Sequence, residues 1–249
     1  MKLRLMVLAV AILVAACGGT TPSSPPVTIN VFAAASLTDS FKALGDAYHR
    51  DHSNVTVRFN FAGTPTLVMQ IEQGAQADVF ASADMTNMNK LRSDGYTGGT
   101  PQVFAHNKLE IVVAAGNPKH IASLADLARP DVIYISAGPT VPAGKYALRA
   151  LQKAGVTATP KSLETDVKSV LSKIELGEAD AGIVYVTDVM SAGSKVGGVQ
   201  IPDADNVVAT YPLATVKDAK NASEADQFIA YVLSSAGQAK LKSFGFLHA

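Results

Sequence analysis

The segment Val27–Phe41, with the sequence VTINVFAAASLTDSF, is the stretch that most directly indicates the fold of this 249-residue chain. It begins with alternating apolar and polar residues and is then continuously apolar up to Ser36, which is typical of a buried parallel strand. Apolar residues next recur at helical spacing, which predicts a helix over Leu37–His49. The segment is therefore expected to fold as a strand and a helix, with Ser36 at the junction.

The same alternation of strand and helix patterns continues to the end of the chain. Further strands are expected over Val55–Phe61, Asp78–Ala81, Leu109–Ala115, Val132–Ser136, Ala181–Tyr185 and Val207–Val216. Further helices are expected over Thr66–Gln73, Met85–Ser93, Leu124–Leu127, Ala143–Ala154, Val167–Leu176, Asp188–Ser191, Ser223–Leu233 and Ala236–Phe244. Strands that alternate with helices predict an α/β fold with mostly parallel sheets.

The order of these elements favours two Rossmann-like lobes joined by a two-strand hinge. Residues 27–106 together with 207–249 are expected to build one lobe, and residues 107–206 the other. Two chain crossings between lobes suit closure around a ligand. Ligands of open α/β sheets bind beyond the carboxyl ends of the strands, so we expect the site in the cleft between the lobes.

The first 16 residues have the pattern of a secretory signal peptide, with a basic start and an apolar run over Leu5–Ala16. This run is too short to remain as a membrane-spanning helix. It leads into Val14–Cys17, VAAC, which resembles a bacterial lipobox, so Cys17 is expected to carry a lipid anchor on the extracytoplasmic face of the cell membrane. Residues 17–26 are then the lipidated N-terminus and a flexible tether. An ordinary signal peptide with a chance cysteine is the alternative.

The composition argues against several classes of function. Basic and acidic residues are equal at 21 each and no basic stripe is present, which speaks against nucleic-acid binding. A single cysteine cannot form a disulfide within the chain. No GxSxG motif is present, and the histidines show no metal-ligand spacing beyond His49 and His52, which are expected on a solvated helix end. Gly138–Lys145 has five residues between its glycines where a Walker A loop has four. We therefore expect no cofactor, no directly coordinated cation and no enzymatic activity. We also expect the protein to be a monomer.

Five positions are candidates for binding one anion: Ser36, Thr64, Ala143, Val167 and Tyr185. The first four lie where a turn or strand end leads into a predicted helix. The first N–H groups of a helix have no intrahelical partner, and the helix dipole places positive charge at that end. Tyr185 ends a predicted strand and could add a hydroxyl donor. Together these groups predict a cage of neutral hydrogen-bond donors around a small oxyanion.

Each of these positions also has an ordinary structural interpretation. Ser36 and Thr64 are residue types that cap helices, and a proline at the first helical position follows Thr64. Asp166 is a candidate cap whose carboxylate would repel an anion, so we expect it to point away and leave the Val167 N–H to bind. Tyr185 could be a core tyrosine whose hydroxyl meets a backbone carbonyl.

Several runs, taken together, resemble the molybdate-binding proteins of bacterial molybdate ABC transporters, which have the type II periplasmic-binding fold. These runs are VFAAASLTDSF, QGAQADVFASAD, VPAGKYALRAL, GIVYVTD and the closing FGF, and they stand in the expected order across nearly all of the mature chain. The resemblance implies a tetrahedral oxyanion held by the hydroxyls of Ser36 and Tyr185 and by N–H groups near Ser36, Thr64, Ala143 and Val167. It also implies delivery of the anion to a membrane permease and its ATPase.

One departure from the family pattern lies at Gly63–Thr66, GTPT, where family members usually have a serine-rich run. The threonines keep hydroxyl groups at this point. Pro65 has no N–H to donate, so the sequence leaves open which group binds there.

The chemistry of molybdate agrees with a site made only of donors. Molybdate is fully deprotonated at neutral pH, whereas hydrogen phosphate carries a proton, and leaving that proton without an acceptor costs roughly 1–3 kcal/mol. Sulfate has the same hydrogen-bonding character as molybdate but a different size, and tungstate matches molybdate in both. A receptor of the same fold for sulfate, phosphate or an organic acid is the first alternative, and an enzyme such as an esterase is the second.

Overall fold

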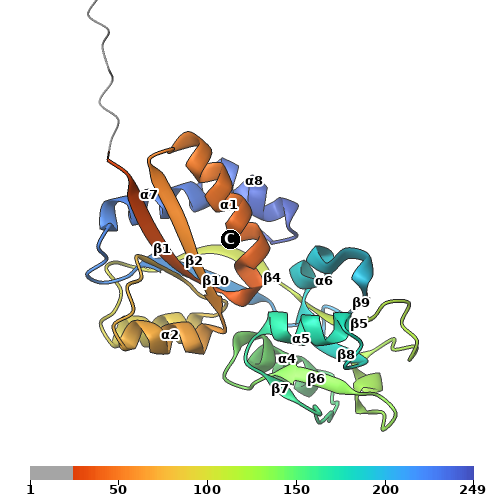
Figure 1. Cartoon of the computed structure of the whole chain (residues 1–249). Helices are drawn as coiled ribbons and strands as arrows, with labels where there is room; N and C mark the ends of the chain where they lie inside the picture. The colour runs from red at the N-terminus through yellow and green to blue at the C-terminus, as the bar shows by residue number, and fades with distance from the viewer. Residues whose placement is uncertain (1–24) are drawn as a thin grey trace, which may run out of the picture.

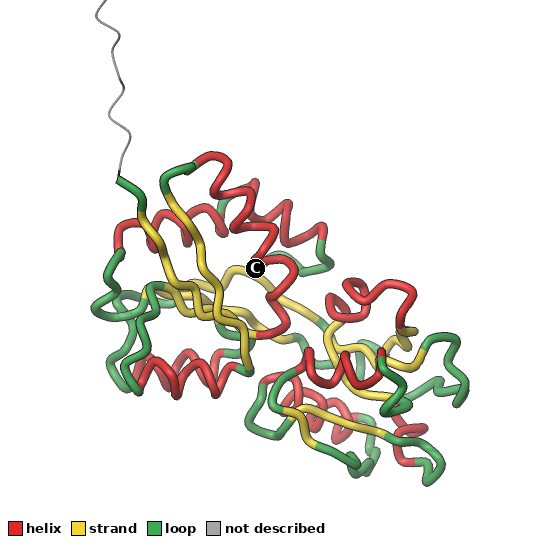
Figure 2. The backbone as a smooth tube through the Cα atoms, viewed as in Figure 1, coloured by secondary structure: helices red, strands yellow, loops and turns green. Residues whose placement is uncertain are grey.

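Two five-stranded sheets, each covered by helices, form the computed structural model, which describes residues 25–249 (Figure 1). The strand order is β2-β1-β3-β10-β4 in the first sheet and β7-β6-β8-β5-β9 in the second. We refer to each sheet with its helices as the first and the second lobe. Figure 2 shows the strands inside each lobe and the helices outside them. The predicted signal peptide and Cys17 lie outside the described residues.

The first lobe has helices on both faces of its sheet. Its strands are β1 (Val27–Ala34), β2 (Val55–Ala62), β3 (Val79–Ala81), β4 (Gln102–Asn107) and β10 (Ala209–Thr215). Its helical segments are η1 (Ala35–Leu37), α1 (Thr38–Asp51), α2 (Thr64–Glu72), α3 (Met85–Ser93), α7 (Ala222–Leu233) and α8 (Ser235–Ser243). Helices α1, α7 and α8 bury Phe41 and Phe228 on one face, and α2 and α3 bury Leu67 and Met88 on the other. The apolar spacing of the helices thus corresponds to their buried faces.

The second lobe is built from the middle of the chain. Its strands are β5 (Leu109–Ala114), β6 (Tyr134–Ala137), β7 (Leu163–Glu164), β8 (Ala181–Tyr185) and β9 (Val196–Gln200). Its helical segments are η2 (Leu124–Ala128), α4 (Pro142–Lys153), α5 (Val167–Glu175), α6 (Val186–Ala192) and η3 (Gly193–Lys195). Helices α4 and α5 both pack against β6 and β8, where they bury Ala147 and Val170. The starts of these two helices therefore lie close to the end of β8.

Only half of the neighbouring strand pairs are parallel. β1 runs parallel to β2 and β3, and β6 runs parallel to β7 and β8, as the alternation of strands and helices predicts. β10 is antiparallel to β3 and β4, and β5 is antiparallel to β8 and β9. The expectation of mostly parallel sheets is wrong for these pairs, because β5 and β10 are the strands on which the chain enters each sheet after crossing between the lobes.

Three strands have no counterpart among the sequence-based expectations: β4, β7 and β9. β4 ends in the polar residues His106 and Asn107, and β9, VGGVQ, contains two glycines, which have low strand propensity. β4 pairs with β10 and β9 pairs with β5. These strands are stabilised by pairing with neighbouring strands, so their local sequence patterns do not predict them.

The chain crosses between the lobes twice, near residue 108 and again over residues 201–208. The buried Asn206 side chain joins the two crossings. Its Oδ1 accepts a hydrogen bond from the Leu109 N–H at 3.0 Å, and its Nδ2 donates to the Leu109 carbonyl oxygen at 2.9 Å. Two short, mutually bonded connections are suited to a hinge between rigid lobes.

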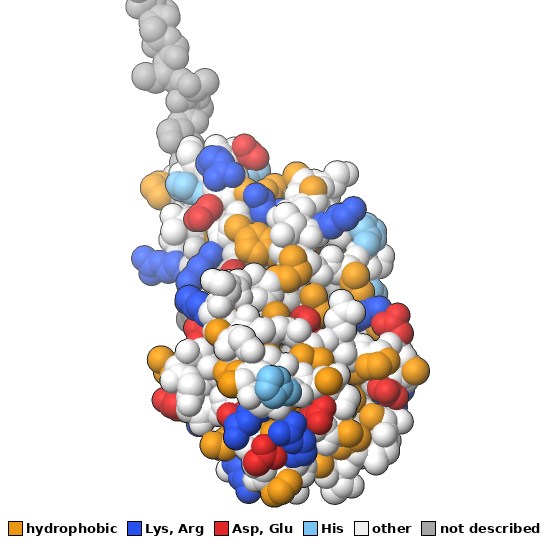
Figure 3. Space-filling view, turned by 90° about the vertical axis from the view of Figure 1, so that its right-hand side faces the viewer, with side chains coloured by type: hydrophobic (Ala, Val, Ile, Leu, Met, Phe, Trp, Pro, Cys, Tyr) orange, Lys and Arg blue, Asp and Glu red, His pale blue; other side chains and the backbone are white. Residues whose placement is uncertain are grey.

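Acidic and basic side chains are interspersed on the face of the molecule shown in Figure 3, without a large region of one sign. This distribution agrees with the equal numbers of acidic and basic residues in the chain. Among the helices of residues 25–249, none is both long enough and apolar enough to cross a bilayer.

Candidate functional site

A small cavity lies between the two lobes, where strand ends meet helix starts. It contains about 210 Å³ of space not filled by protein atoms. This figure includes space open to solvent; the room for the centre of a water-sized sphere is about 10 Å³, close to the ~10–15 Å³ that one water molecule needs. The cavity is lined by Ala34, Ala35, Ser36, Ala62, Gly63, Thr64, Ala83, Val141, Pro142, Ala143, Asp166, Val167 and Tyr185. Its size suits a small ion.

All five positions selected from the sequence line this cavity. Ser36 lies in η1 and Thr64 opens α2, both in the first lobe. Ala143 lies in the first turn of α4, Val167 opens α5, and Tyr185 ends β8, all in the second lobe. The fold therefore brings the five positions together, while their contact with an anion stays a prediction.

Three of the helical segments that begin at the cavity have no side-chain cap: η1, α2 and α4. Their first N–H groups have no intrahelical acceptor, so these groups are available to a bound anion. Helix α5 differs, because the Asp166 carboxylate accepts hydrogen bonds from the Ser169 N–H at 2.8 Å and from the Ser169 hydroxyl at 3.1 Å. The predicted capping role of Asp166 is confirmed, and its two oxygens are engaged with its own helix.

The hydroxyls of Ser36 and Thr64 do not cap helices. Ser36 lies within η1, and its Oγ lies 3.0 Å from the Tyr211 Oη. The residue before α2 is Gly63, and Thr64 is the first residue of that helix, with its Oγ1 3.5 Å from the Ala83 N–H nitrogen. The capping interpretation of both residues is therefore wrong, and neither hydroxyl is tied up in a helix cap.

Two glycines allow close backbone approach around the cavity. At Gly144, in the first turn of α4, a Cβ atom would overlap the carbonyl oxygens of Ala137 and Gly138. At Gly63, just before α2, a Cβ atom would overlap the carbonyl oxygen of Thr165, which belongs to the other lobe. A side chain at position 63 would therefore hold the two lobes apart beside the cavity.

Tyr185 contributes a buried hydroxyl that is not paired. The residue is only 1% exposed, and its Oη has no hydrogen-bond partner among the described residues. The interpretation in which this hydroxyl meets a backbone carbonyl is therefore wrong. Burial raises the pKa of Tyr185 well above its ordinary value, so the hydroxyl stays protonated and can donate to an anion. A buried polar group without a partner is uncommon, and a hydrogen bond to a bound anion would give this hydroxyl one.

The backbone of Tyr185 is held by a buried aspartate. The Asp188 Oδ2 accepts a hydrogen bond from the Tyr185 N–H at 3.1 Å. Burial raises the pKa of Asp188 to about 6, although the nearby Lys168 acts in the opposite direction. Burial alone would lower the pKa of Lys168, but the carboxylates of Asp188 and Asp39 outweigh it and raise that pKa overall.

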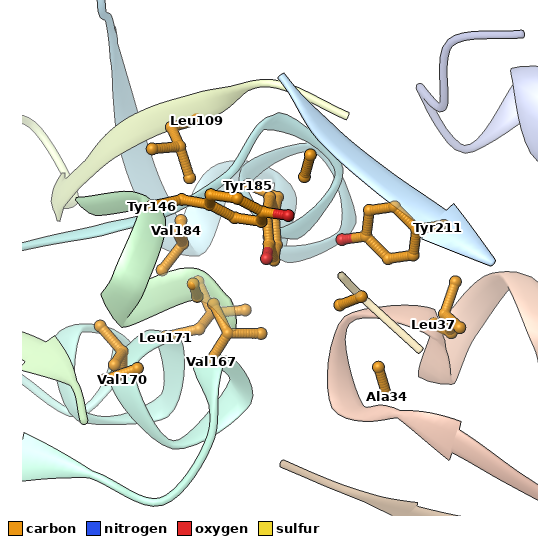
Figure 4. Close-up of a cluster of buried hydrophobic side chains, with 14 of the residues drawn as sticks. Ala34, Leu37, Leu109, Tyr146, Val167, Val170, Leu171, Val184, Tyr185 and Tyr211 are labelled. Atoms are coloured by element: carbon orange, nitrogen blue, oxygen red, sulfur yellow. The ribbon is translucent and has the colours of Figure 1, made fainter. Parts of the chain in front are cut away.

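Two further buried tyrosines, Tyr146 and Tyr211, lie beside Tyr185 (Figure 4). Burial raises the pKa of Tyr146 to about 12 and raises that of Tyr211 well above its ordinary value. These hydroxyls therefore remain protonated at neutral pH. Tyr211 is not among the five positions expected from the sequence, because it lies 175 residues from Ser36 on a strand with no motif of its own.

The lysines of the candidate segments are paired with carboxylates of other elements. Lys145 of α4 bonds to Asp84 of the first lobe. The Nζ of Lys168 in α5 lies 2.8 Å from the Asp39 Oδ2 of the first lobe and 3.4 Å from the Asp188 Oδ1. No lysine or arginine is among the residues that line the cavity. These ion pairs connect the lobes around the cavity and leave its lining without a positive side chain.

The cavity wall contains hydroxyl groups and one acidic residue. No histidine lines the cavity, so its hydroxyls have no imidazole base beside them. Within residues 25–249, no group of three or more His, Asp or Glu side chains is placed to hold a metal ion.

Residues 29–247 match the profile of a family described as bacterial extracellular solute-binding protein. The chain is similar to the molybdate-binding protein ModA of Mycobacterium tuberculosis, with 42% identity over 93% of this chain and 91% of that protein. It is also similar to YvgL of Bacillus subtilis, a putative ABC transporter substrate-binding lipoprotein, with 33% identity over 94% of this chain and 93% of that protein. Among solved structures, the periplasmic molybdate-binding protein of Azotobacter vinelandii shares the fold, with a TM-score of 0.79 and 20% identity over 89% of this chain and 99% of that chain.

Proposed function

The chain belongs to the family of bacterial extracellular solute-binding proteins, and we propose that it captures molybdate between its lobes and delivers it to an ABC importer. It is a solute-binding protein and not an enzyme. The observation that carries the proposal is the cavity of about 210 Å³, which all five sequence-selected positions line and which has no lysine or arginine in its wall. The 42% identity to a molybdate-binding protein supports this choice of ligand.

In the proposed complex, the Ser36 and Tyr185 hydroxyls donate to the anion. Backbone N–H groups near Ser36, Thr64, Ala143 and Val167 supply the remaining donors. The starts of η1, α2 and α4 have no side-chain caps, so their N–H groups gain partners when the anion binds. Because Pro65 has no N–H, we assign the donor at α2 to the N–H or hydroxyl of Thr64.

An acceptor-only anion fits this site better than a protonated one. Asp166 is among the residues that line the cavity, and its carboxylate accepts two hydrogen bonds from Ser169 of its own helix. The donors assigned above are hydroxyl and N–H groups, which an acceptor-only anion such as molybdate can satisfy without leaving a proton of its own unpaired, and this favours molybdate over phosphate. Tungstate has the same charge and hydrogen-bonding character as molybdate, so we propose that it binds as well. Sulfate is separated from both by size alone.

We further propose that Cys17 carries a lipid anchor and that the protein works as a monomer on the extracytoplasmic face of the cell membrane. The similarity to a putative substrate-binding lipoprotein supports the anchor. The partners of the loaded protein are a membrane permease and its ATPase. Anchoring keeps the receptor near this importer through a tether rich in Gly, Pro and Ser.

A thermal-shift screen of oxyanions on the purified protein tests the proposed ligand. At a hundredfold excess over Kd, ligand binding stabilises the native state by about 2.7 kcal/mol, which corresponds to a rise in Tm of roughly 5–11 °C for a protein of this size. Molybdate and tungstate should produce this rise, and sulfate and phosphate at the same concentration should produce little. A rise with sulfate equal to that with molybdate would refute the assignment of molybdate as the selected ligand.

A further inference from the structure

Tyr211 lies behind the cavity wall and contacts a residue assigned to the anion. It belongs to β10, the strand on which the chain returns to the first lobe, and it is fully buried. Its Oη lies 3.0 Å from the Oγ of Ser36, a distance at which either hydroxyl can donate to the other. Tyr211 does not line the cavity, so its effect on an anion must pass through Ser36.

The ring of Tyr211 is held in place on several sides. It makes edge-on contacts with Phe104 and Phe246, with ring centroids 6.2 and 5.5 Å away, and with Tyr185 of the other lobe at 5.8 Å. The pairing of β10 with β4 is irregular between Tyr211 and Pro212, and such bulges re-aim side chains. Figure 4 shows the Tyr211 hydroxyl turned toward Tyr185. The direction of this hydroxyl is therefore set by packing.

The number of protons decides the direction of the Ser36–Tyr211 hydrogen bond. Each hydroxyl has one proton to donate and can accept through its oxygen. An anion that only accepts requires the Ser36 proton, and the Ser36 oxygen is then left to accept from Tyr211. Because burial keeps Tyr211 protonated, its hydroxyl can supply that bond.

We propose that Tyr211 is a positioning residue that donates to the Ser36 Oγ and thereby directs the Ser36 O–H into the cavity. The inference rests on the proposed function, because it assumes an acceptor-only oxyanion in this cavity. It adds selectivity to the site: the bond from Tyr211 holds the Ser36 proton toward the cavity, so a proton on the ligand meets a donor there and not an acceptor. In Tyr211→Phe the Ser36 hydroxyl is free to rotate and to accept, so a protonated oxyanion should lose less affinity than molybdate does.

A double-mutant cycle tests this role by calorimetry with molybdate. Wild type, Tyr211→Phe, Ser36→Ala and the double variant are compared. Tyr48→Phe is the control, because Tyr48 is also fully buried but its hydroxyl, unlike that of Tyr211, has no partner among the described residues. Tyr211→Phe should weaken binding about three- to tenfold in the wild-type background, the range for one hydrogen bond. It should change affinity by less than about twofold in the Ser36→Ala background. Tyr48→Phe should leave affinity unchanged.

The ratio of molybdate to phosphate affinity supplies a second readout, which general loss of packing does not move. This ratio should fall in Tyr211→Phe and stay constant in Tyr48→Phe. If Tyr211→Phe lowers molybdate affinity equally in both Ser36 backgrounds, or does not lower it at all, the positioning role is overturned. In either case, molybdate binding by the wild type upholds the proposed function. If the wild type binds sulfate or phosphate instead, the proposed ligand is refuted and the same cycle is run with the anion that binds. Binding of none of these anions overturns both proposals.

Discussion

The Tyr185 hydroxyl is the group whose removal tests the donor cage most directly. Tyr185→Phe deletes one oxygen and keeps the ring, which is 1% exposed and packs against Tyr211 at a centroid distance of 5.8 Å. The ring of phenylalanine can occupy the same space. The substitution therefore removes a donor with little change in packing.

The expected loss of molybdate affinity can be estimated from the hydrogen bonding of this hydroxyl in the ligand-free protein. It has no partner among the described residues, and a buried unpaired polar group costs about 1–3 kcal/mol. A hydrogen bond to a charged group contributes about 1.5–3 kcal/mol, so Tyr185→Phe should weaken molybdate binding roughly ten- to hundredfold. The free energy of unfolding of the ligand-free protein should not fall, because the deleted hydroxyl makes no bond in that state.

Calorimetric titration with molybdate and thermal unfolding of the ligand-free protein measure the two effects separately. Tyr48→Phe is the matched control, since it also removes a buried hydroxyl without a partner, at the end of α1. It should change neither molybdate affinity nor the rise in Tm that molybdate causes. An unchanged affinity in Tyr185→Phe would refute the reasoning and leave Tyr185 as a core residue only.

Three further predictions address closure, pH and anchoring. Gly63→Ala places a Cβ against the Thr165 carbonyl oxygen of the other lobe, so molybdate affinity should fall roughly ten- to hundredfold while the ligand-free Tm stays unchanged. The control is Gly99→Ala, whose Cβ meets no atom within 4 Å and which should bind molybdate normally. Equal affinities of the two variants would contradict close approach of the lobes. Burial raises the pKa of Asp188 to about 6 from about 3.9 in the unfolded chain, so its stabilising contribution is complete below pH ~4 and lost as pH rises to ~6. The unfolding free energy of wild type relative to Asp188→Asn should therefore increase by roughly 2–3 kcal/mol between pH 6.5 and 4, and a flat difference would show that this carboxyl has an ordinary pKa. Cys17→Ala should release the protein from the membrane fraction, or leave it unprocessed, without changing molybdate affinity. If the variant is still labelled by metabolic acyl labelling, Cys17 is not the lipidated residue.

Local patterns in the sequence were sufficient for most of the first lobe. The run VTINVFAA forms β1 at the residues expected, because continuous apolar side chains can be buried only in a strand covered on both faces. The helices over Met85–Ser93 and Val167–Glu175 likewise lie where their spacing predicts. The strand β9, with its two glycines, could not be predicted, because its stability comes from pairing with β5.

The candidate site was predictable for a related reason. Ser36, Thr64, Ala143 and Val167 each lie at a helix start, and helix starts depend on a few neighbouring residues. Their order with GIVYVTD resembled a known family, which placed Tyr185 beside them. Tyr211 was not predictable, because its contact with Ser36 joins residues 175 positions apart and no local pattern encodes it.

The sequence by itself determined where strands end and helices begin, and hence which backbone N–H groups lack partners. It also supplied the neutral donors and the absence of net charge. Only the tertiary structure decided that these groups meet in one cavity, that Lys145 and Lys168 are paired with carboxylates of the opposite lobe, and that Gly63 touches the Thr165 carbonyl. The physical reason is range: hydrogen bonding at a helix start is local, whereas burial, ion pairing and close approach depend on residues that chain folding brings together from far apart.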